Sequence, residues 1–408
     1  MYYLEGNINF KLITKREELA EFVQAALYDN PPPKRKDARI LIKPNLNNDL
    51  NALTGNSTDL RLIHALLVEL KARGYKDVLV ADGSNYGVHR KGINVFQRLG
   101  LDRLCAHFGY RHLDLNNAEY REVELYPGVT TGIALVCLEA DFIINLPTVK
   151  THAEAGLSCC MKNLVGINVG QYKRKMHWDL PKAIFAINKI IKPNMHLVDG
   201  LVGMEGNGPG NGRPIRMDFL AYGDNAFLLD AVITRLIGYG SAGDIPYLNY
   251  AIREGILSAQ TIDKIAQIKP LLHILKPDKR NFLIGLLGHN KLAPVRSLIR
   301  PLLDSTFARK LLMRCKLTQD IYEKDDPESF QMVYEPNNCL DCGICREYCP
   351  VEIAPPASET DVCLRCLNCY WVCAHKAINL TGELGYLKSH IERYKKLIED
   401  NVGSKKSK

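Results

Sequence analysis

The sequence predicts an α/β protein: a mostly parallel sheet flanked by helices, with a helical insert and a small cysteine-rich α+β domain. Two observations predict it. In the first 250 residues, short apolar runs alternate with segments of helical periodicity, which is typical of βαβ units. Further on, eight of the thirteen cysteines fall between Cys339 and Cys373. We therefore expect four parts, at residues 1–250, 251–330, 331–382 and 383–408.

The elements of the first part follow from periodicity and from helix caps. Ser57, Thr58 or Asp59 can cap a helix that Gly74 ends. Apolar runs bounded by Pro, Gly or Asn indicate strands. In chain order we expect a strand at 38–46, a helix at 57–75, a strand and turn at 77–87, a helix at 94–109, strand character at 133–147, and a strand with a helix at 219–240.

Polar loops are expected after four strands, three of those above and the run "KPNMHL" (192–197). Because the carboxyl ends of parallel strands meet at one edge of a sheet, the loops would form one site. Ordinary surface turns are the alternative, since Gly, Asn and Asp favour turns. The loops are "KPNLNND" (43–49), "ADGSNYG" (81–87), "LPTVKTH" (146–152) and "LVDGLVGMEGNGPGNG" (197–212).

The stretch 152–177 is the strongest candidate for substrate chemistry. A lysine in a loop that enters a helix becomes a nucleophile or base when it is desolvated, and histidine carries protons near neutral pH. The basic run "KRK" (173–175) suits a phosphate or polycarboxylate. The alternatives are a structural role for each histidine, a solvated face for "KRK", and simple packing for Cys159 and Cys160. The candidate catalytic residues are Lys162, His152, His177, Asp199 and Glu205, and the candidate cofactor-binding residues are Gly156, Ser158 and Asn163.

Two cysteine runs, 339–349 and 363–373, share the spacing C-x2-C-x2-C-x3-C. Each iron of a [4Fe–4S] cube needs one thiolate. A zinc site, which needs four ligands per ion, and a disulfide knot are the alternatives. Residues 331–382 resemble the bacterial two-cluster ferredoxins, although Ala374 stands where that family often has proline. The resemblance implies two [4Fe–4S] clusters with crossed ligands, one on Cys339, Cys342, Cys345 and Cys373, the other on Cys363, Cys366, Cys369 and Cys349.

The α/β part resembles the family called domain of unknown function 362 over residues 38–245, through "IKPNL", "VADGSNYG", "NLPTVKTHAEAGLSCCMKNLVGI" and "VDGLVGMEGNGPGNG". Its members are described as uncharacterised iron–sulfur proteins. One loop is also distantly similar to the H-x3-G-x-S-G-G-x-K loop of nickel-pincer lactate racemases. That similarity implies an anchoring or nucleophilic Lys162 and an acid–base His152. Cys159 and Cys160 replace the two glycines, and we infer no nickel.

Positive charge is concentrated in residues 264–316, with twelve Lys or Arg against two acids. The formal net charge of the whole chain is +8, so the remainder is slightly acidic. This distribution argues against a nucleic-acid-binding protein. We expect 264–316 to be helical and to contact an acidic partner or a membrane surface. Neither a signal peptide nor an apolar run that could span a bilayer is seen, so we expect a cytoplasmic protein.

Two functions fit these observations. The first is an iron–sulfur oxidoreductase that passes low-potential electrons through two clusters to or from a small anionic or carbonyl substrate at the strand-end loops. The second is an electron carrier or scaffold that serves a separate redox enzyme. Both require an external protein as electron donor or acceptor. The chain lacks a G-x-G-x-x-G motif after a strand, so no nicotinamide or flavin site is predicted.

Overall fold

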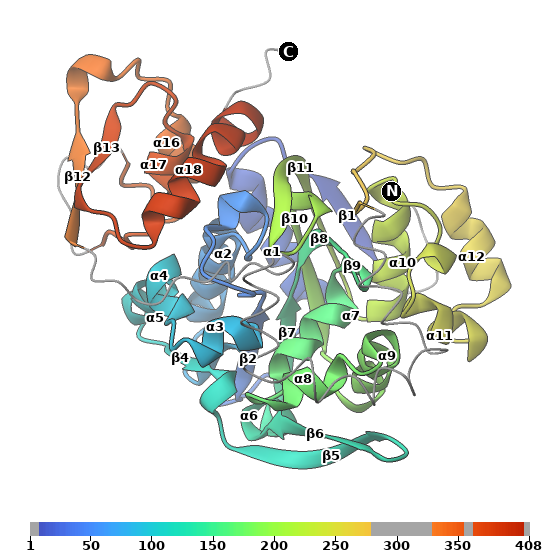
Figure 1. Cartoon of the computed structure of the whole chain (residues 1–408). Coiled ribbons are helices and arrows are strands. Elements are labelled where there is room, and N and C mark those ends of the chain that lie inside the picture. The colour runs from blue at the N-terminus through green and yellow to red at the C-terminus, as the bar shows by residue number, and fades with distance from the viewer. Residues whose placement is uncertain (1–7, 279–328, 355–361, 404–408) are drawn as a thin grey trace, which may run out of the picture.

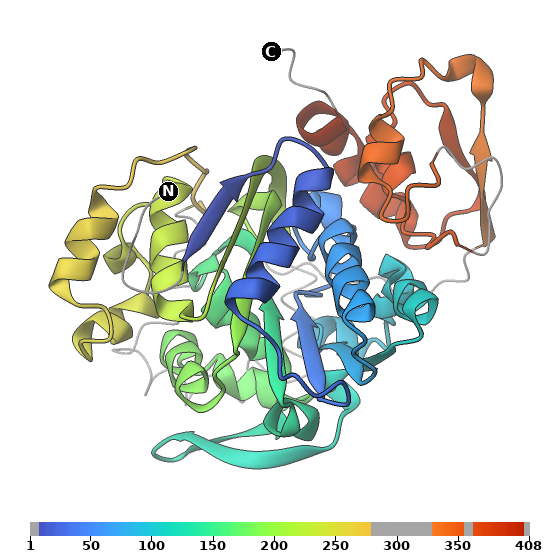
Figure 2. The same cartoon turned by 180° about the vertical axis from the view of Figure 1, so that it is seen from behind.

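The computed structural model describes residues 8–278, 329–354 and 362–403. A nine-stranded sheet, ordered β1-β11-β10-β7-β2-β3-β4 with β8 and β9 attached beside β10, forms the centre of the α/β domain (Figures 1 and 2). The predicted fold class is confirmed. The strands are β1 (Asn9–Leu12), β2 (Ile40–Pro44), β3 (Val78–Asp82), β4 (Arg111–Asp114), β7 (Phe142–Leu146), β8 (Thr148–His152), β9 (Gly156–Ser158), β10 (Met195–Asn207) and β11 (Asn211–Gly223).

The central strands are parallel and buried on both faces. β2 pairs in parallel with β3 and with β7, and all five of its residues are buried. Ile40 and Ile42 pack with one hydrophobic cluster and Leu41 with another on the opposite face, as the two-residue period of a strand requires. Helices must therefore cover both faces of the sheet, which is typical of α/β proteins.

Helices lie on the two faces. Asp59 caps α2 by accepting a hydrogen bond from Arg61 N at 2.8 Å. α1 and α2 pack on one face and α9 on the other (Figures 1 and 2). The helices of this domain are α1 (Glu17–Asp29), α2 (Leu60–Ala72), α3 (Tyr86–Arg90), α4 (Val95–Leu99), α5 (Leu101–Phe108), α6 (Leu135–Glu139), α7 (Cys160–Asn163), α8 (Tyr172–Met176), α9 (Leu180–Ile190), α10 (Ala226–Leu236), α11 (Leu248–Arg253) and α12 (Ala259–Ala266).

Three expected elements differ from the structure. The single helix at 94–109 is two helices, because Gly100 at φ +75° ends α4. The strand character at 133–147 is interrupted by α6, between β6 and β7. The glycine-rich loop at 197–212 is largely strand, since β10 and β11 pair antiparallel from His196 to Gly223. The glycines of β10 resemble turn residues in the sequence. In the structure, side chains of β11 occupy the space that side chains at these positions would need.

The cysteine-rich module lies beside the α2 and α4 end of the domain (Figure 1). It consists of the antiparallel pair β12 (Ser329–Tyr334) and β13 (Ile378–Glu383), with α16 (Ile344–Tyr348), α17 (Asn368–Val372) and the C-terminal α18 (Leu387–Ile398). Leu50, Leu53 and Val202 of the α/β domain share a hydrophobic cluster with this module. A separate hairpin, β5 (Tyr120–Tyr126) and β6 (Val129–Ala134), extends from the opposite end (Figure 1).

The insert expected at 251–330 is described as far as Asp278. α12 ends at Ala266, and the chain from 267 to 278 is not helical, so the helical prediction for 264–316 is wrong there. Pro270 and Pro277 lack the N–H that a helix needs. Residues 279–316 of the basic segment lie outside the described residues. Within the parts that are described, no helix combines the length and apolarity needed to cross a membrane.

Candidate functional site

Four lysines with buried or half-buried side chains lie near the carboxyl ends of the central strands. Lys43 is on β2, Lys150 is on β8, Lys162 is on α7 and Lys173 is on α8. Lys43 and Lys150 are at most 1% exposed, and Lys173 is 4% exposed. We call these four residues the lysine site. Buried ammonium groups are rare because an unpaired buried charge is costly, so four of them indicate a special environment.

Three of the four lysines are held by the protein. Lys43 Nζ donates to Asp82 Oδ1 at 2.6 Å. Lys150 Nζ donates to Asn45 Oδ1 at 2.6 Å and to the carbonyl of Asn56. Lys173 Nζ donates to the carbonyl of Ser84 at 2.9 Å and to Asn116 Oδ1 at 2.5 Å. Within the described parts of the chain, Asp82 is the one carboxylate that forms an ion pair with any of these lysines.

Lys162 differs from the other three. Its side chain is half-buried, and its ammonium has no hydrogen-bond or ion-pair partner among the described residues. Burial lowers the pKa of Lys162 to about 8, Glu154 opposes this effect, and Lys43 adds to it. The pKa of Lys173 falls to about 7, mainly through burial, and that of Lys150 falls well below its ordinary value through burial and the charge of Lys162. The lowered pKa values show that the described residues do not fully compensate the cost of burying these ammonium groups.

Glycines bring the backbone close to these charges. A Cβ atom on Gly166 would lie 2.3 Å from Asp82 Oδ1 and 2.8 Å from Lys43 Nζ. A Cβ atom on Gly83 would lie 2.2 Å from Lys173 Nζ. Side chains at either position would collide with the lysines or displace them. The glycines thus allow the loops after β3 and α7 to close over the lysine site.

Asn163, predicted to bind a cofactor, is the centre of a buried hydrogen-bond network. Its Oδ1 accepts from Asn45 Nδ2 at 2.8 Å and from Lys43 Nζ at 3.2 Å. Its Nδ2 donates to Asn145 Oδ1 at 2.8 Å. The amide is therefore engaged by the protein on both sides. Its role in this structure is to tie α7 to the ends of β2 and β7 and so to place Lys162.

His152 is buried and neutral. Its Nδ1 accepts hydrogen bonds from the backbone N–H groups of Glu154 and Ala155, at 3.2 and 3.1 Å. The proton of the neutral ring is therefore on Nε2. Burial, with the charge of Lys162 second, lowers the pKa of His152 well below its ordinary value. His152 is suited to donate a hydrogen bond from Nε2. His177 is exposed, and its Nδ1 lies 3.0 Å from Glu154 Oε2.

The two predicted carboxylates occupy different positions on β10. Asp199 is buried, and its oxygens accept from Asp59 N at 2.8 Å and Leu201 N at 3.1 Å. Burial, followed by the charge of Asp59, raises the pKa of Asp199 to about 7. Glu205 binds Arg213 Nη2 at 3.0 Å and Leu275 N at 2.9 Å, so its contacts are structural. No contact in the described residues joins Glu205 to the lysine site.

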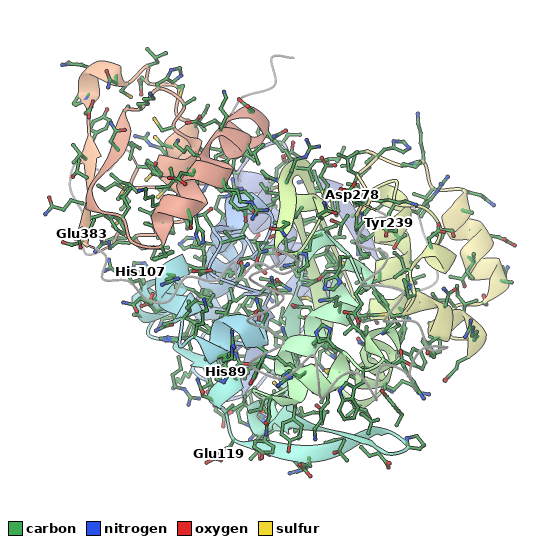
Figure 3. All side chains as sticks on the ribbon, in the orientation of Figure 1. His89, His107, Glu119, Tyr239, Asp278 and Glu383 are labelled. Carbon is green, nitrogen blue, oxygen red and sulfur yellow. The ribbon has the colours of Figure 1, made fainter. Side chains whose placement is uncertain are left out.

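The remaining predicted residues belong to the β8–β9 hairpin. Ser158 is buried and paired in register with Lys150. Gly156, at φ +78°, packs near Ile245 and Tyr239, so the structure places it against the α10–α11 side of the domain. Figure 3 labels Tyr239 and Asp278 on this side, away from the cysteine module. Gly156 therefore shapes the hairpin, whereas Ser158 lies beside a lysine of the site.

Cys159 and Cys160 lie next to Asp230 at the start of α7. Their sulfur atoms are 3.9 Å apart, and the carboxylate accepts from Cys160 N at 2.7 Å, Met161 N at 3.1 Å and Tyr247 OH at 3.0 Å. Burial raises the pKa of Cys159 to about 11 and that of Cys160 well above its ordinary value. Both thiols are thus protonated and packed, and Asp230 anchors the helix that carries Lys162.

Sequence reasoning missed Lys43 and Lys150 as functional candidates. Lys173 belongs to "KRK" (173–175), a run that suits a phosphate or a solvated face, and its side chain is buried. A signal was present for the other two: "ILIKP" and "TVKTH" each place a lysine within an otherwise buried strand. A lysine at such a position needs a partner or a ligand.

The eight module cysteines can be divided into two sets by their electrostatic interactions, although Cys345 of one set also acts on Cys369 of the other. The thiol of Cys345, whose pKa burial raises, is affected by Cys342, Cys373 and Cys339. Burial also raises the pKa of Cys366, and Cys349, Cys369 and Cys363 add to this. We call Cys339, Cys342, Cys345 and Cys373 the outer set, and Cys349, Cys363, Cys366 and Cys369 the inner set. These are the ligand groups that the ferredoxin resemblance implies.

The spacing of the sulfur atoms fits a group larger than a single ion. All eight cysteines are free thiols, and no three of their sulfurs lie within 4.8 Å of one another in the described residues. A tetrahedral zinc site would hold its sulfurs about 3.8 Å apart. The outer set instead lines a cavity of about 360 Å³, bordered also by Leu340, His375 and Ile378. Four thiols around one cavity are the kind of ligand set that an iron–sulfur cube requires.

Known proteins resemble parts of this chain. A thylakoid-associated protein of Synechocystis sp. is 35% identical over 107 residues, which are 24% of this chain and 33% of that protein's length. The apoprotein of lactate racemase from Thermoanaerobacterium thermosaccharolyticum matches with 16% identity and a TM-score of 0.32, covering 53% of this chain and 54% of the racemase chain. A crystal structure of a Thermotoga maritima protein matches with 14% identity and a TM-score of 0.30, covering 52% and 55%.

The racemase and Thermotoga similarities are too distant to support a functional argument, and the Synechocystis match covers about a third of that protein. The family match is longer and includes all four lysines and every predicted residue of the α/β site. Residues 40–235 match the family model described as domain of unknown function (DUF362).

Proposed function

We propose that the protein is an iron–sulfur oxidoreductase that passes electrons through two [4Fe–4S] clusters to or from a small anionic substrate at the lysine site. The inner and outer sets would each hold one cluster. When bound, such clusters supply one-electron transfer at low potential, on the order of −400 mV. The residues of the α/β domain would bind the substrate, orient it and exchange protons with it.

Lys162 carries this proposal. Its half-buried ammonium lacks a partner among the described residues, and of the three neighbouring lysines Lys43 alone forms an ion pair with a described carboxylate. A carboxylate or phosphate would supply the missing negative charge and recover the cost of desolvation. With a pKa of about 8, Lys162 can also lose or gain a proton near neutral pH. Nε2 of His152 offers a neutral hydrogen-bond donor for an oxygen atom of the substrate.

Selective labelling of Lys162 tests the binding half of the proposal. An amine-acylating reagent at pH 8 should modify Lys162 faster than ordinary lysines, because more of it is unprotonated. Orthophosphate and acetate are separate probes of a phosphate or carboxylate preference. At least one of them should slow the labelling of Lys162, measured by peptide mass spectrometry, without affecting Lys189, an exposed lysine paired with Glu254. No protection by either anion up to high millimolar concentration would contradict the anion site.

Substitution of Lys162 tests the enzymatic half. Lys162→Ala should keep the fold and the iron content but lose anion binding and turnover. Lys189→Ala is the matched control and should keep both. An unfolded Lys162→Ala protein, or one that binds the anions as wild type does, would contradict the proposal.

An electron carrier or scaffold is the second candidate. It is favoured by the exposure of the outer set: Cys342 is exposed, and the adjacent Leu340 is 68% exposed. Such a surface suits electron exchange with another protein. For a carrier, Lys162→Ala should leave electron transfer to an acceptor protein unchanged. The expected contact of 264–316 with a membrane or an acidic partner lies mostly outside the described residues.

A further inference from the structure

The inner and outer sets have different surroundings. Cys349 and Cys363 of the inner set are buried, at 8% and 9% exposure, and Leu364 and Cys366 pack against the main hydrophobic core of the α/β domain. Cys342 of the outer set is exposed. Gly100, which separates α4 from α5, allows close contact here, because a Cβ atom on it would lie 2.3 Å from the carbonyl oxygen of Leu364.

Three side chains of the α/β domain donate hydrogen bonds to carbonyls of inner-set cysteines. Arg16 Nη1 donates to Cys349, Asn51 Nδ2 donates to Cys366 at 2.7 Å, and Arg103 Nη1 donates to Cys363 at 3.2 Å. Arg16 also donates to the carbonyls of Glu347 and Pro350, at 3.0 and 2.7 Å. The three donors come from the start of α1, from the loop after β2 and from α5. They converge on one set from three separate elements.

The outer set receives no such donor from the described part of the α/β domain. The carbonyl of Cys373 accepts from Lys395 Nζ at 3.0 Å, but Lys395 is on α18 of the module itself. Figure 3 labels His107 on α5 and Glu383 at the end of β13 on the side of the molecule where the module lies. The difference in hydrogen-bond donors between the two sets therefore follows from which side of the module contacts the α/β domain.

One loop joins the inner set to the lysine site. Asn51 lies between Asn45 and Asn56, and these two residues accept the hydrogen bonds of Lys150 Nζ. Asn51 also donates to Asn368 Oδ1 at 2.9 Å, next to the ligand Cys369. The loop that binds Lys150 thus also contacts the inner set.

We propose that Arg16, Asn51 and Arg103 are positioning residues that hold the inner set against the α/β domain and stabilise added negative charge there. This inference rests on the proposed function, because it requires a cluster on each set. Reduction adds one electron, and no bond or proton, to a cluster. Nearby guanidinium charges and hydrogen-bond donors favour the reduced form, and they act more strongly where water is excluded. Removing one of them should therefore lower the potential of the inner set and spare the outer set.

Redox titration of the whole chain tests this inference. Arg103→Gln removes a charge at an exposed side chain without opening the core. Anaerobic titration with dithionite, followed by electron paramagnetic resonance, should show one of two cluster signals shifted to lower potential. Arg103→Lys, which keeps the charge, should recover much of the shift. Arg16→Gln should shift the same signal. Arg111→Gln is the control, since this exposed arginine on β4 pairs with Asp77 instead.

Ligand substitution assigns the signals. Cys363→Ser should alter the signal that responds to Arg103, and Cys339→Ser should alter the other. Unchanged potentials in Arg103→Gln and Arg16→Gln, an equal shift of both signals, or a shift of the outer signal alone would overturn the inference while leaving the proposed function standing. Wild-type protein that holds no iron after anaerobic purification and reconstitution would overturn the cluster assignment, and this inference with it.

Discussion

Replacing Lys162 with methionine should make the protein more stable and unable to bind its ligand. Methionine keeps the apolar volume of the lysine stem and removes the ammonium. In wild type that ammonium is half-buried and without a partner among the described residues, so it lowers the stability of the folded state. The same charge would bind the anion.

The magnitude follows from the pKa of Lys162, which burial lowers from 10.5 to about 8. This difference corresponds to about 3 kcal/mol of stability lost at neutral pH. It is an upper limit, because part of the side chain reaches solvent. We expect Lys162→Met to raise the free energy of unfolding by about 1–3 kcal/mol at pH 7.

The pH dependence identifies the cause. Because the folded state loses this proton at a lower pH than the unfolded state, the unfolded state binds more protons between pH 8 and 10.5. Wild-type stability should therefore gain a contribution that rises over this range, and the advantage of Lys162→Met should shrink toward zero.

Urea unfolding at pH 7, 8, 9 and 10 measures this difference, with Lys189→Met as the control for loss of an exposed lysine. A variant less stable than wild type by 1 kcal/mol or more, or an advantage that does not change with pH, would refute the reasoning.

Three further predictions concern neighbouring groups. Burial raises the pKa of Asp199 from 3.8 to about 7, so its charge costs increasingly more stability as the pH rises from 4 to 7. In urea titrations, Asp199→Asn should therefore gain stability relative to wild type over that range. A stability difference that stays constant with pH would contradict this. Asn163→Leu should lower the free energy of unfolding by about 2–4 kcal/mol, because it leaves several buried polar groups unpaired; a loss below 1 kcal/mol would show that the network is dispensable. Since burial raises the pKa of Cys159 to about 11, Cys159 and Cys160 should resist a maleimide at pH 8 in the native protein and react with it in urea. Peptide mass spectrometry can measure this labelling. Rapid labelling of the native protein would contradict the packed geometry.

The parallel core could be predicted because its strands obey simple rules. "ILIK" is apolar on both faces and ends at a proline, and β2 occupies 40–44 within the expected 38–46. Pro147 likewise separates β7 from β8, as its missing N–H requires. Local composition is sufficient to predict a strand that is buried on both faces.

The glycine-rich stretch of β10 could not be assigned from composition. Gly200 and Gly203 look like turn residues, but a Cβ atom would lie 2.5 Å from the ring of Phe219 at Gly200 and 2.3 Å from Met217 at Gly203. The space for those side chains is taken by β11. This is a tertiary constraint that one strand alone does not reveal, and it placed Asp199 and Glu205 on a strand instead of in a loop.

The candidate site was predicted in part. The charge of Lys162 lowers the pKa of His152, so the two side chains interact, as their closeness in the sequence suggested. Lys43 and Lys150 were missed because burial of a lysine runs against its usual preference for solvent. The assignment of the module cysteines to two clusters stays a prediction from their spacing in the sequence.

The iron and sulfide content of the anaerobically purified protein tests the central claim most directly. The account predicts about eight irons and eight acid-labile sulfides per chain, from two cubes of four, falling to about four of each in Cys363→Ser if the inner cluster is lost. Four irons or fewer after full reconstitution of the wild type, or zinc in proportion to the cysteines, would contradict it.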